Sequence, residues 1–197
     1  MPKVSDAYRE ARRDEIARAA IQRLSRQGFS GTSMADIIDE SGMSAGAIYS
    51  HFASKAEIAQ HVARMVVGTR ADELVALAQS AEPPLGPIQI ISYVLERSRL
   101  LGIRRVMLLQ VWAEATVDPE FRAIVDETVG RLRTAYGDAI APWLRARGRQ
   151  TDAATIRSLA DTMVAVSQGF VVNSALFGND DPQAYLTGIG ELFESRT

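Results

Sequence analysis

The side chains that could do chemistry in this chain of 197 residues are few. It contains no cysteine and two histidines, His51 and His61. Without cysteine it has no disulfide, no thiolate nucleophile and no cysteine-based zinc site. A metal centre in a helical bundle needs a Glu three residues before a His, and neither histidine has one. We therefore expect no catalytic residue, no metal site and no cofactor.

A different chemistry is available in the stretch SGMSAGAIYSHFASK, residues 41–55. Small residues at Ser44, Ala45 and Gly46 would let the backbone approach a large partner closely. An alanine methyl can pack on a thymine methyl, and a serine hydroxyl can donate or accept a hydrogen bond at a base edge. Three further side chains here can donate hydrogen bonds to phosphate: Tyr49, His51 and Lys55. The stretch therefore suits contact with DNA.

Capping signals divide the first part of the chain into helices that could position this stretch. Thr32 or Ser33 can begin a short helix that Gly42 ends, and Ser44 can begin the next one. Two short helices joined by a tight turn form a helix-turn-helix, whose second helix enters the major groove. The expected helices here are 6–27, about 32–42, 44–52 and 54–79.

The remaining residues also predict helices, because apolar residues recur at intervals of three and four and almost no segment alternates with period two. We expect an all-α protein of about nine helices, the later ones at 87–101, 104–116, 119–147, 153–177 and 182–195. No secretory signal is recognisable, so the expected location is the cytoplasm.

Residues 162–179 contain no charged side chain. Amides, serines and glycines among them argue against a membrane span, and we expect no membrane partner. A helix that is apolar nearly all round must be buried on more than one side, so we expect a homodimer formed through about 153–195. The alternative is a central core helix of one chain. The last helix would add apolar residues to the interface: Tyr185, Leu186, Ile189, Leu192 and Phe193.

The net charge of −2 hides a basic N-terminal segment. Seven basic residues stand against four acidic ones in residues 1–33. This asymmetry suits a polyanionic partner, but a solvated helix face with ion pairs three or four residues apart explains it equally.

Residues 8–60 resemble the DNA-binding domain of the TetR family of bacterial transcriptional regulators. The resemblance is carried by Gly28, Phe29, Thr32, Met34 and Ile37, followed by the run GMSAGAIYSHFASKAEI. It implies a helix-turn-helix domain at 1–55 and a larger helical ligand-binding and dimerisation domain at 56–197. It also implies a homodimer that binds a palindromic DNA operator and a small-molecule effector that releases it, most often as a repressor.

The resemblance assigns roles to individual residues. Ser44, Ala45 and Gly46 would lie against bases, while Thr32, Tyr49 and Lys55 would contact phosphate. His51 would either contact phosphate or pack within the helices. Each has a structural alternative: Tyr49 could pack on the first helix, and Lys55 belongs to a helix-capping segment. The full set of expected DNA-contacting residues is Thr32, Ser33, Ser44, Ala45, Gly46, Tyr49, His51 and Lys55.

The effector pocket that the resemblance implies should be apolar and aromatic with a few polar anchors. Candidate residues are Tyr93, Met107, Gln110, Trp112, Met163, Phe170, Asn173 and Phe177. Ordinary core packing is the alternative for each. Gln168 and Asn173 need polar partners on an otherwise apolar helix. Two other functions remain open, an enzyme and a helical adaptor that no longer binds DNA.

Overall fold

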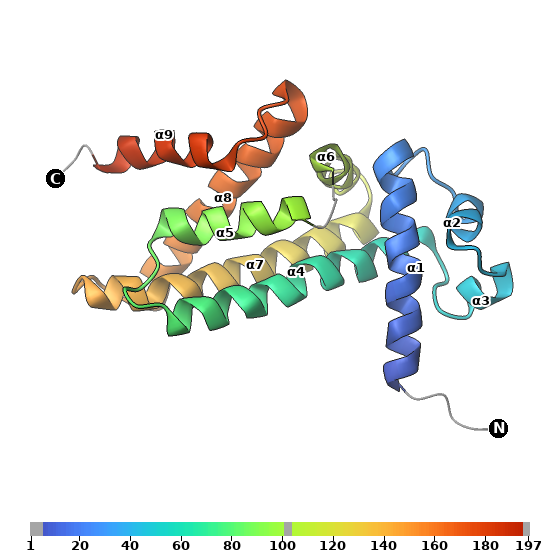
Figure 1. Ribbon diagram of the computed structural model, residues 1–197, viewed down its shortest axis with the longest axis horizontal. Helices are drawn as coiled ribbons and strands as arrows, with labels where there is room; N and C mark the ends of the chain where they lie inside the picture. Colours follow the sequence, from blue (N-terminus) through green and yellow to red (C-terminus); the bar gives the residue numbers. More distant parts are fainter. Residues whose placement is uncertain (1–5, 101–103, 195–197) are drawn as a thin grey trace. The chain divides into compact units, whose positions relative to one another are not determined.

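The computed structural model of the chain is all-α, as the hydrophobic periodicity predicts. It describes residues 6–100 and 104–194, and the side chains of these apart from 66–70, 98–100 and 192–194. The helices (Figure 1) are α1 (Asp6–Gln27), α2 (Met34–Ser41), α3 (Ala45–Tyr49), α4 (Lys55–Ser80), α5 (Pro87–Leu100), α6 (Arg105–Glu114), α7 (Pro119–Ala146), α8 (Ala153–Phe177) and α9 (Pro182–Glu194).

Local capping explains where these helices begin and end. Ser33 caps α2 and forms a capping box with Asp36, and Gly42 ends the helix in the left-handed conformation at φ 64°. Ser44 caps α3 by accepting a hydrogen bond from the backbone N–H of Ala47. The predicted ends are confirmed within a few residues. The largest difference is α3, which is shorter than the predicted 44–52 because residues 50 and 51 form a turn.

The chain folds into two compact units, which are described separately. The first contains the chain up to Val66 together with Val106–Asp126, and the second contains Val67–Arg105 and the chain from Glu127 onward. Both α4 and α7 therefore pass from one unit into the other, and α6 belongs to the first. The functional boundary predicted between residues 55 and 56 stays a prediction.

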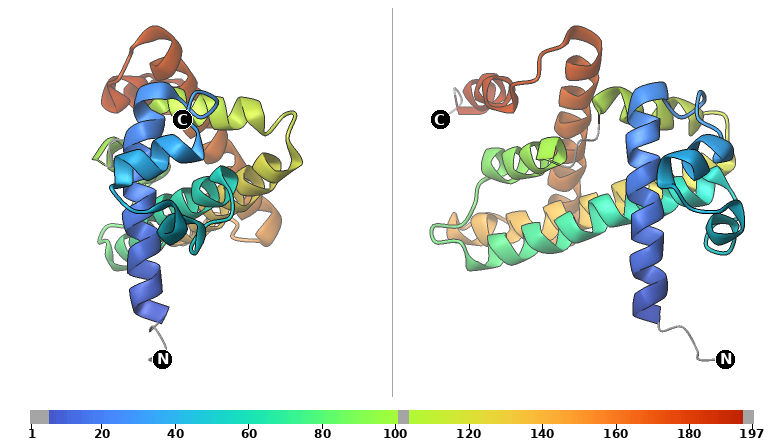
Figure 2. Two further views of the ribbon diagram at one scale, coloured as in Figure 1. Left: turned by 90° about the vertical axis from the view of Figure 1, so that its right-hand side faces the viewer. Right: turned by 45° about the vertical axis from the view of Figure 1, so that its right-hand side comes forward.

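The core of the first unit holds α3 in place. In this unit α2 packs against α1, and α3 follows α2 (Figures 1 and 2). Ile48 of α3 and Phe52 just after it are almost fully buried. Phe29 meets Phe121 of α7 edge to face, with ring centroids 4.5 Å apart. Other buried side chains of this core are Ile16, Ala20, Leu24, Ile37, Ile58 and Val62.

The core of the second unit lies among α4, α5, α7, α8 and α9. Its largest fully buried side chain is Tyr136, whose hydroxyl lies 2.7 Å from the Ser167 hydroxyl. Burial raises the pKa of the Tyr136 phenol, so the group stays neutral. The pair satisfies two buried polar groups, because Ser167 also donates to the Met163 carbonyl at 2.9 Å.

α8 buries one stripe within this chain. The stripe consists of Ala160, Met163, Val164, Ser167, Phe170, Val171 and Ser174. Leu176 and Phe177 are exposed at 63% and 76%. This chain alone therefore does not bury α8 on several sides, as the sequence predicts. Nowhere in the described part of the chain does a helix have the length and hydropathy of a membrane span.

The apolar side of α9 packs against the core of the second unit. Leu186 is buried in the core of the second unit, and Ile189 packs against it. The Tyr185 hydroxyl donates to the Val166 carbonyl at 3.2 Å. These three residues attach α9 to its own chain, and the part in a subunit interface expected of them stays a prediction. Leu192 and Phe193 lie outside the residues whose side chains are described.

Candidate nucleic-acid interface

α3 has one buried face and one exposed face. Ile48 fastens the buried face, while Ser44, Ala45, Gly46 and Tyr49 are exposed. A Cβ atom built on Gly46 would meet no atom within 4 Å. The exposed face of α3 therefore carries only short side chains at these three positions, with the larger Tyr49 side chain beside them.

Gly46 is not required by the fold. It lies inside a helix, where glycine is about 1 kcal/mol less favourable than alanine. The open space around it rules out a packing reason within the described chain. The close approach of a partner that the sequence predicts for Ser44, Ala45 and Gly46 would account for a small residue here, and it stays a prediction.

Tyr49 and His51 differ in their surroundings. The Tyr49 side chain is 53% exposed and reaches solvent, which suits a contact with a partner better than packing on α1. His51 is half buried, and its Nδ1 atom is buried with no hydrogen-bond partner. The backbone carbonyl of His51 accepts a hydrogen bond from Arg13 at 2.5 Å. These contacts fit the alternative that His51 packs within the helices.

Arg13 is a contributor that sequence reasoning missed. Besides binding the His51 carbonyl, its guanidinium lies over the Phe52 ring at 4.1 Å and pairs with Glu57 at 3.4 Å. It therefore fixes the turn between α3 and α4 to α1. No local pattern reveals this role, because its partners lie 38 and 44 residues away along the chain.

Lys55 holds the connection between α1 and α2. Its ammonium donates to the carbonyls of Phe29 at 2.7 Å and Thr32 at 2.6 Å, and it lies 4.0 Å from the Phe29 ring centroid. Burial lowers the pKa of this ammonium. Because an ammonium has three donors, one remains for a phosphate. Two of the three Lys55 donors thus bind carbonyls within the chain, and the expected phosphate contact would use the third.

Thr32 faces the interior rather than the surface. Its side chain is 2% exposed, and its hydroxyl donates to the Gly28 carbonyl at 2.7 Å. Its backbone N–H donates to the Phe29 carbonyl at 3.2 Å. The expected phosphate contact of Thr32 has no support here, because both of its donors are used within the chain. Ser33 is exposed but engaged in the capping box of α2.

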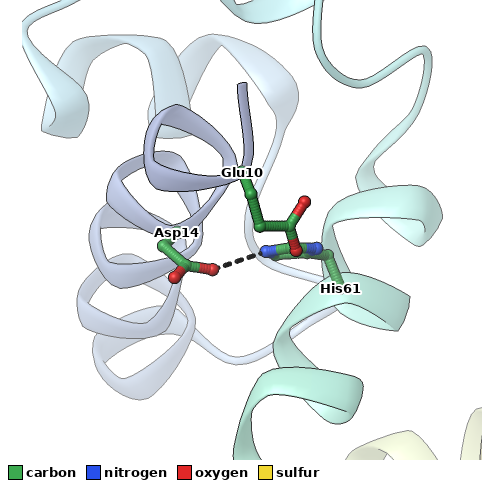
Figure 3. Close-up of side chains that lie close together, drawn as sticks. All are labelled: Glu10, Asp14 and His61. Atoms are coloured by element: carbon green, nitrogen blue, oxygen red, sulfur yellow. Dashed lines mark hydrogen bonds and ion pairs between the residues drawn. The ribbon is translucent and has the colours of Figure 1, made fainter. Parts of the chain in front are cut away.

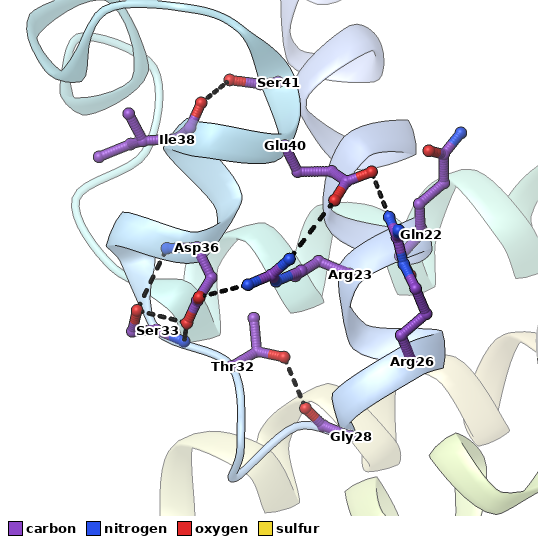
Figure 4. A network of polar contacts seen from close by, with 10 residues as sticks. All are labelled: Gln22, Arg23, Arg26, Gly28, Thr32, Ser33, Asp36, Ile38, Glu40 and Ser41. Carbon is purple, nitrogen blue, oxygen red and sulfur yellow. Dashed lines mark hydrogen bonds and ion pairs between the residues drawn. The ribbon is translucent and has the colours of Figure 1, made fainter.

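Two of the three acidic residues of α2 are paired with α1. Asp36 pairs with Arg23 at 2.7 Å, and Glu40 contacts both Arg23 and Arg26 (Figure 4). The third, Asp39, is exposed. The ion pairs neutralise two carboxylates that would otherwise repel a polyanion.

The capping box should make the first unit sensitive to acid. Hydrogen bonds from the hydroxyl and backbone N–H of Ser33, with Arg23, lower the pKa of Asp36 to about 2. A carboxylate with a depressed folded-state pKa contributes stability above its unfolded value, and the contribution disappears as pH falls through the folded value. We expect Asp36→Asn to flatten the acid side of the stability profile between about pH 4 and pH 2. Thermal melts of both proteins across this range measure the effect, and parallel profiles would contradict it.

The eight candidate effector residues are divided between the two units. Met107, Gln110 and Trp112 belong to the first unit, and the other five belong to the second. Gln110 accepts a hydrogen bond from the Phe29 N–H at 3.0 Å, so it supports the α1–α2 connection. The Asn173 amide donates to the Gly169 carbonyl of its own helix at 3.0 Å, which satisfies its need for a partner.

Of the other six, Met107 is buried and Trp112 is half-buried, and the remaining four have surroundings that require no ligand. Met163 and Phe170 are core residues, the Tyr93 hydroxyl donates to Glu73 at 3.2 Å, and Phe177 is exposed. A pocket of about 340 Å³ in the second unit contains none of the eight. It lies between α4 and α7 and is lined by Ala71, Asp72, Val75, Gly130, Arg131, Thr134, Ala135 and Asp138.

Two protein-family models match the chain. One, for the bacterial regulatory proteins of the TetR family, matches residues 16–62. The other, for the C-terminal part of BetI-type transcriptional repressors, matches residues 96–188. The first contains α3, and together the two take in most of the sequence.

Individual proteins give the same picture. The HTH-type transcriptional regulator YfiR of Bacillus subtilis is 27% identical over 96% of this chain and 92% of its own length. TtgR of Pseudomonas putida, also an HTH-type transcriptional regulator, is 34% identical over 57% of this chain and 46% of its own.

Solved structures establish the shared fold. A TetR-family regulator from Syntrophomonas wolfei has a TM-score of 0.75 at 13% identity, covering 94% of both chains. A transcriptional regulator from Saccharomonospora viridis, in complex with choline, has a TM-score of 0.70 at 22% identity over 93% of this chain and 96% of that one.

Proposed function

Since this chain belongs to the TetR family of bacterial transcriptional regulators, we propose that it is a repressor that binds a palindromic operator as a homodimer. A small-molecule effector releases it from the DNA. The observation that carries DNA binding is the exposed face of α3, where Ser44, Ala45 and Gly46 stand clear of the chain. This face suits insertion into a major groove, and Tyr49 and the remaining donor of Lys55 are the phosphate contacts of the proposal.

Support for a homodimer comes from the uncovered side of α8. Leu176 and Phe177 are large, apolar and exposed at one end of this helix, and Ala165 is exposed farther along it. Exposed apolar surface of this kind is typical of a contact with another protein. A second copy of the chain is the occupant we propose, because a two-fold pair also matches a palindromic operator.

The effector that we propose to try first is a small organic cation. The choline complex of the Saccharomonospora viridis protein favours this class. The pocket between α4 and α7 carries Asp72 and Asp138 against a single Arg131, so its charge suits a cation. Its volume lies at the lower end of the range for small-molecule sites.

Operator capture from fragmented genomic DNA, followed by binding measured at several salt concentrations, tests the proposal. Because each phosphate contact displaces counterions, we expect affinity for the captured operator to fall about 10³-fold or more between 50 and 200 mM salt. The complex should contain two chains per palindrome. An adaptor that has lost DNA binding would capture no sequence in excess over random fragments.

Choline and related quaternary amines, added to the preformed complex, test the effector class separately. Release at a concentration that leaves an unrelated repressor bound supports it. Retention of the complex with every amine would reject this class of effector and leave the operator-binding proposal standing.

A further inference from the structure

A cluster of metal-binding side chains lies on the first unit, away from the exposed face of α3. Glu10 and Asp14 stand one turn apart on α1 and face His61 of α4 (Figure 3). One donor atom from each residue lies within 4.8 Å of the others. The His61 ring is 5% exposed, and its Nε2 atom is 2.9 Å from Asp14 Oδ1. The three groups therefore converge on one small volume at the edge of the core.

The charge around this cluster is unbalanced. Neither Glu10 nor Asp14 is within ion-pair distance of an arginine or lysine among the residues that the structure describes. Two neighbouring arginines are used elsewhere, since Arg12 pairs with Glu15 and Arg13 with Glu57. Two carboxylates that converge on one imidazole favour a bound cation.

We propose that Glu10, Asp14 and His61 bind one divalent transition-metal ion, with Zn²⁺ as the ion to test first. Imidazole with carboxylates suits Zn²⁺, Ni²⁺, Co²⁺ and Mn²⁺, whereas Mg²⁺ and Ca²⁺ prefer oxygen alone. Donor atoms on one tetrahedral zinc lie about 3.4 Å apart, given bond lengths of about 2.1 Å. Small side-chain rotations bring the present spacing to that value, and water would complete the coordination.

The chemistry of binding is an exchange of a proton for a metal ion. The contact between His61 Nε2 and Asp14 Oδ1 is a hydrogen bond that holds one proton between them. The metal takes the place of this proton and bonds to the imidazole nitrogen and the carboxylate oxygen. From a neutral imidazole the proton moves to Nδ1 by exchange with solvent, and from an imidazolium, whose Nδ1 already carries a proton, it is released to solvent. The sequence predicted no metal site because that expectation rested on Glu and His three residues apart on one helix, whereas these ligands come from two.

A metal at this position would link α1 to α4 inside the first unit. The same segment of α1 carries Arg13, which holds the His51 carbonyl at the end of the α3 turn. An ion joining the two helices would therefore rigidify the support on which α3 rests. This inference concerns metal binding and stability, and it does not depend on the proposed operator.

The experiment uses the full chain without an affinity tag, treated with a chelator and then dialysed. Titration calorimetry with ZnCl₂ should show one ion per chain, with Mn²⁺ weaker than Zn²⁺. Thermal melts with Zn²⁺ should show a higher Tm, because the ion binds the folded state. Co²⁺ should produce a visible absorption band from coordination by nitrogen and oxygen.

Glu10→Gln is the decisive variant, because Glu10 is exposed and its loss should leave the fold intact. We expect it to weaken Zn²⁺ binding at least about tenfold. Glu15→Gln is the matched control on the same helix, whose carboxylate binds Arg12 instead, and it should bind Zn²⁺ like the wild type. Absence of saturable binding to the wild type, or equal affinity in wild type and Glu10→Gln, would overturn the proposal.

Discussion

Ala45→Leu is expected to lower operator affinity about a hundredfold, equivalent to the loss of one or two good base contacts. Ala45 is exposed on the first turn of α3, where the added carbon atoms would stand between the helix and the floor of the groove. Leucine is a good helix former, so the Tm should stay within a degree or so of the wild type. Fluorescence anisotropy with the captured operator measures the first effect, and a thermal melt measures the second.

Two companion variants separate contact from fold. Ala76→Leu adds the same bulk at an exposed position of α4 in the second unit and should leave affinity unchanged. Gly46→Ala adds a single methyl where the chain has open space, so it should raise stability by up to about 1 kcal/mol while weakening operator binding. Wild-type affinity in both α3 variants would mean that this face does not approach the bases.

Lys55→Met is expected to destabilise the chain by about 2 kcal/mol, because charged hydrogen bonds to two carbonyls are lost while the apolar stem is kept. For a chain of this length the Tm should fall by about 4 to 8 °C. Loss of the ammonium leaves the carbonyls of Phe29 and Thr32 without their donor. Urea unfolding and thermal melts of the two proteins provide the measurement.

The control for Lys55→Met is Arg18→Met, which removes one positive charge from the exposed part of α1. It should leave the Tm unchanged. If Lys55 acted chiefly on phosphate, its replacement would weaken binding to every DNA sequence at an unchanged Tm. That result would restore the role that the sequence analysis gave it.

Helix ends were predictable because their causes are local. Ser33 with Asp36, Gly42, and Ser44 each specify a helix end through hydrogen bonds or backbone conformation within four residues. Spacing alone also places Gly46 on the opposite side of α3 from the buried Ile48, because two residues turn a helix by about 200°. The surface expected to meet bases could thus be named from the sequence.

Contacts between distant residues could not be predicted in this way. The resemblance assigned the Lys55 ammonium to phosphate, yet its partners within the chain lie 23 and 26 residues earlier. Gln110 was taken for a pocket residue, and its partner Phe29 is 81 residues away. Periodicity shows which side of a helix is apolar, but not which element covers that side.

Because Val106–Asp126 belongs to the first unit, the N-terminal helices of this chain lose partners when they are transferred to another regulator on their own. Phe29 receives its aromatic neighbour from Phe121 and its hydrogen-bond acceptor from Gln110, both contributed after the chain has returned from the second unit. A chimaera that transplants only residues 1–55 onto another C-terminal half would leave these two partners behind. Engineers who wish to give this chain's DNA preference to a different sensor should therefore carry Val106–Asp126 along with the N-terminal helices, or rebuild both contacts in the recipient.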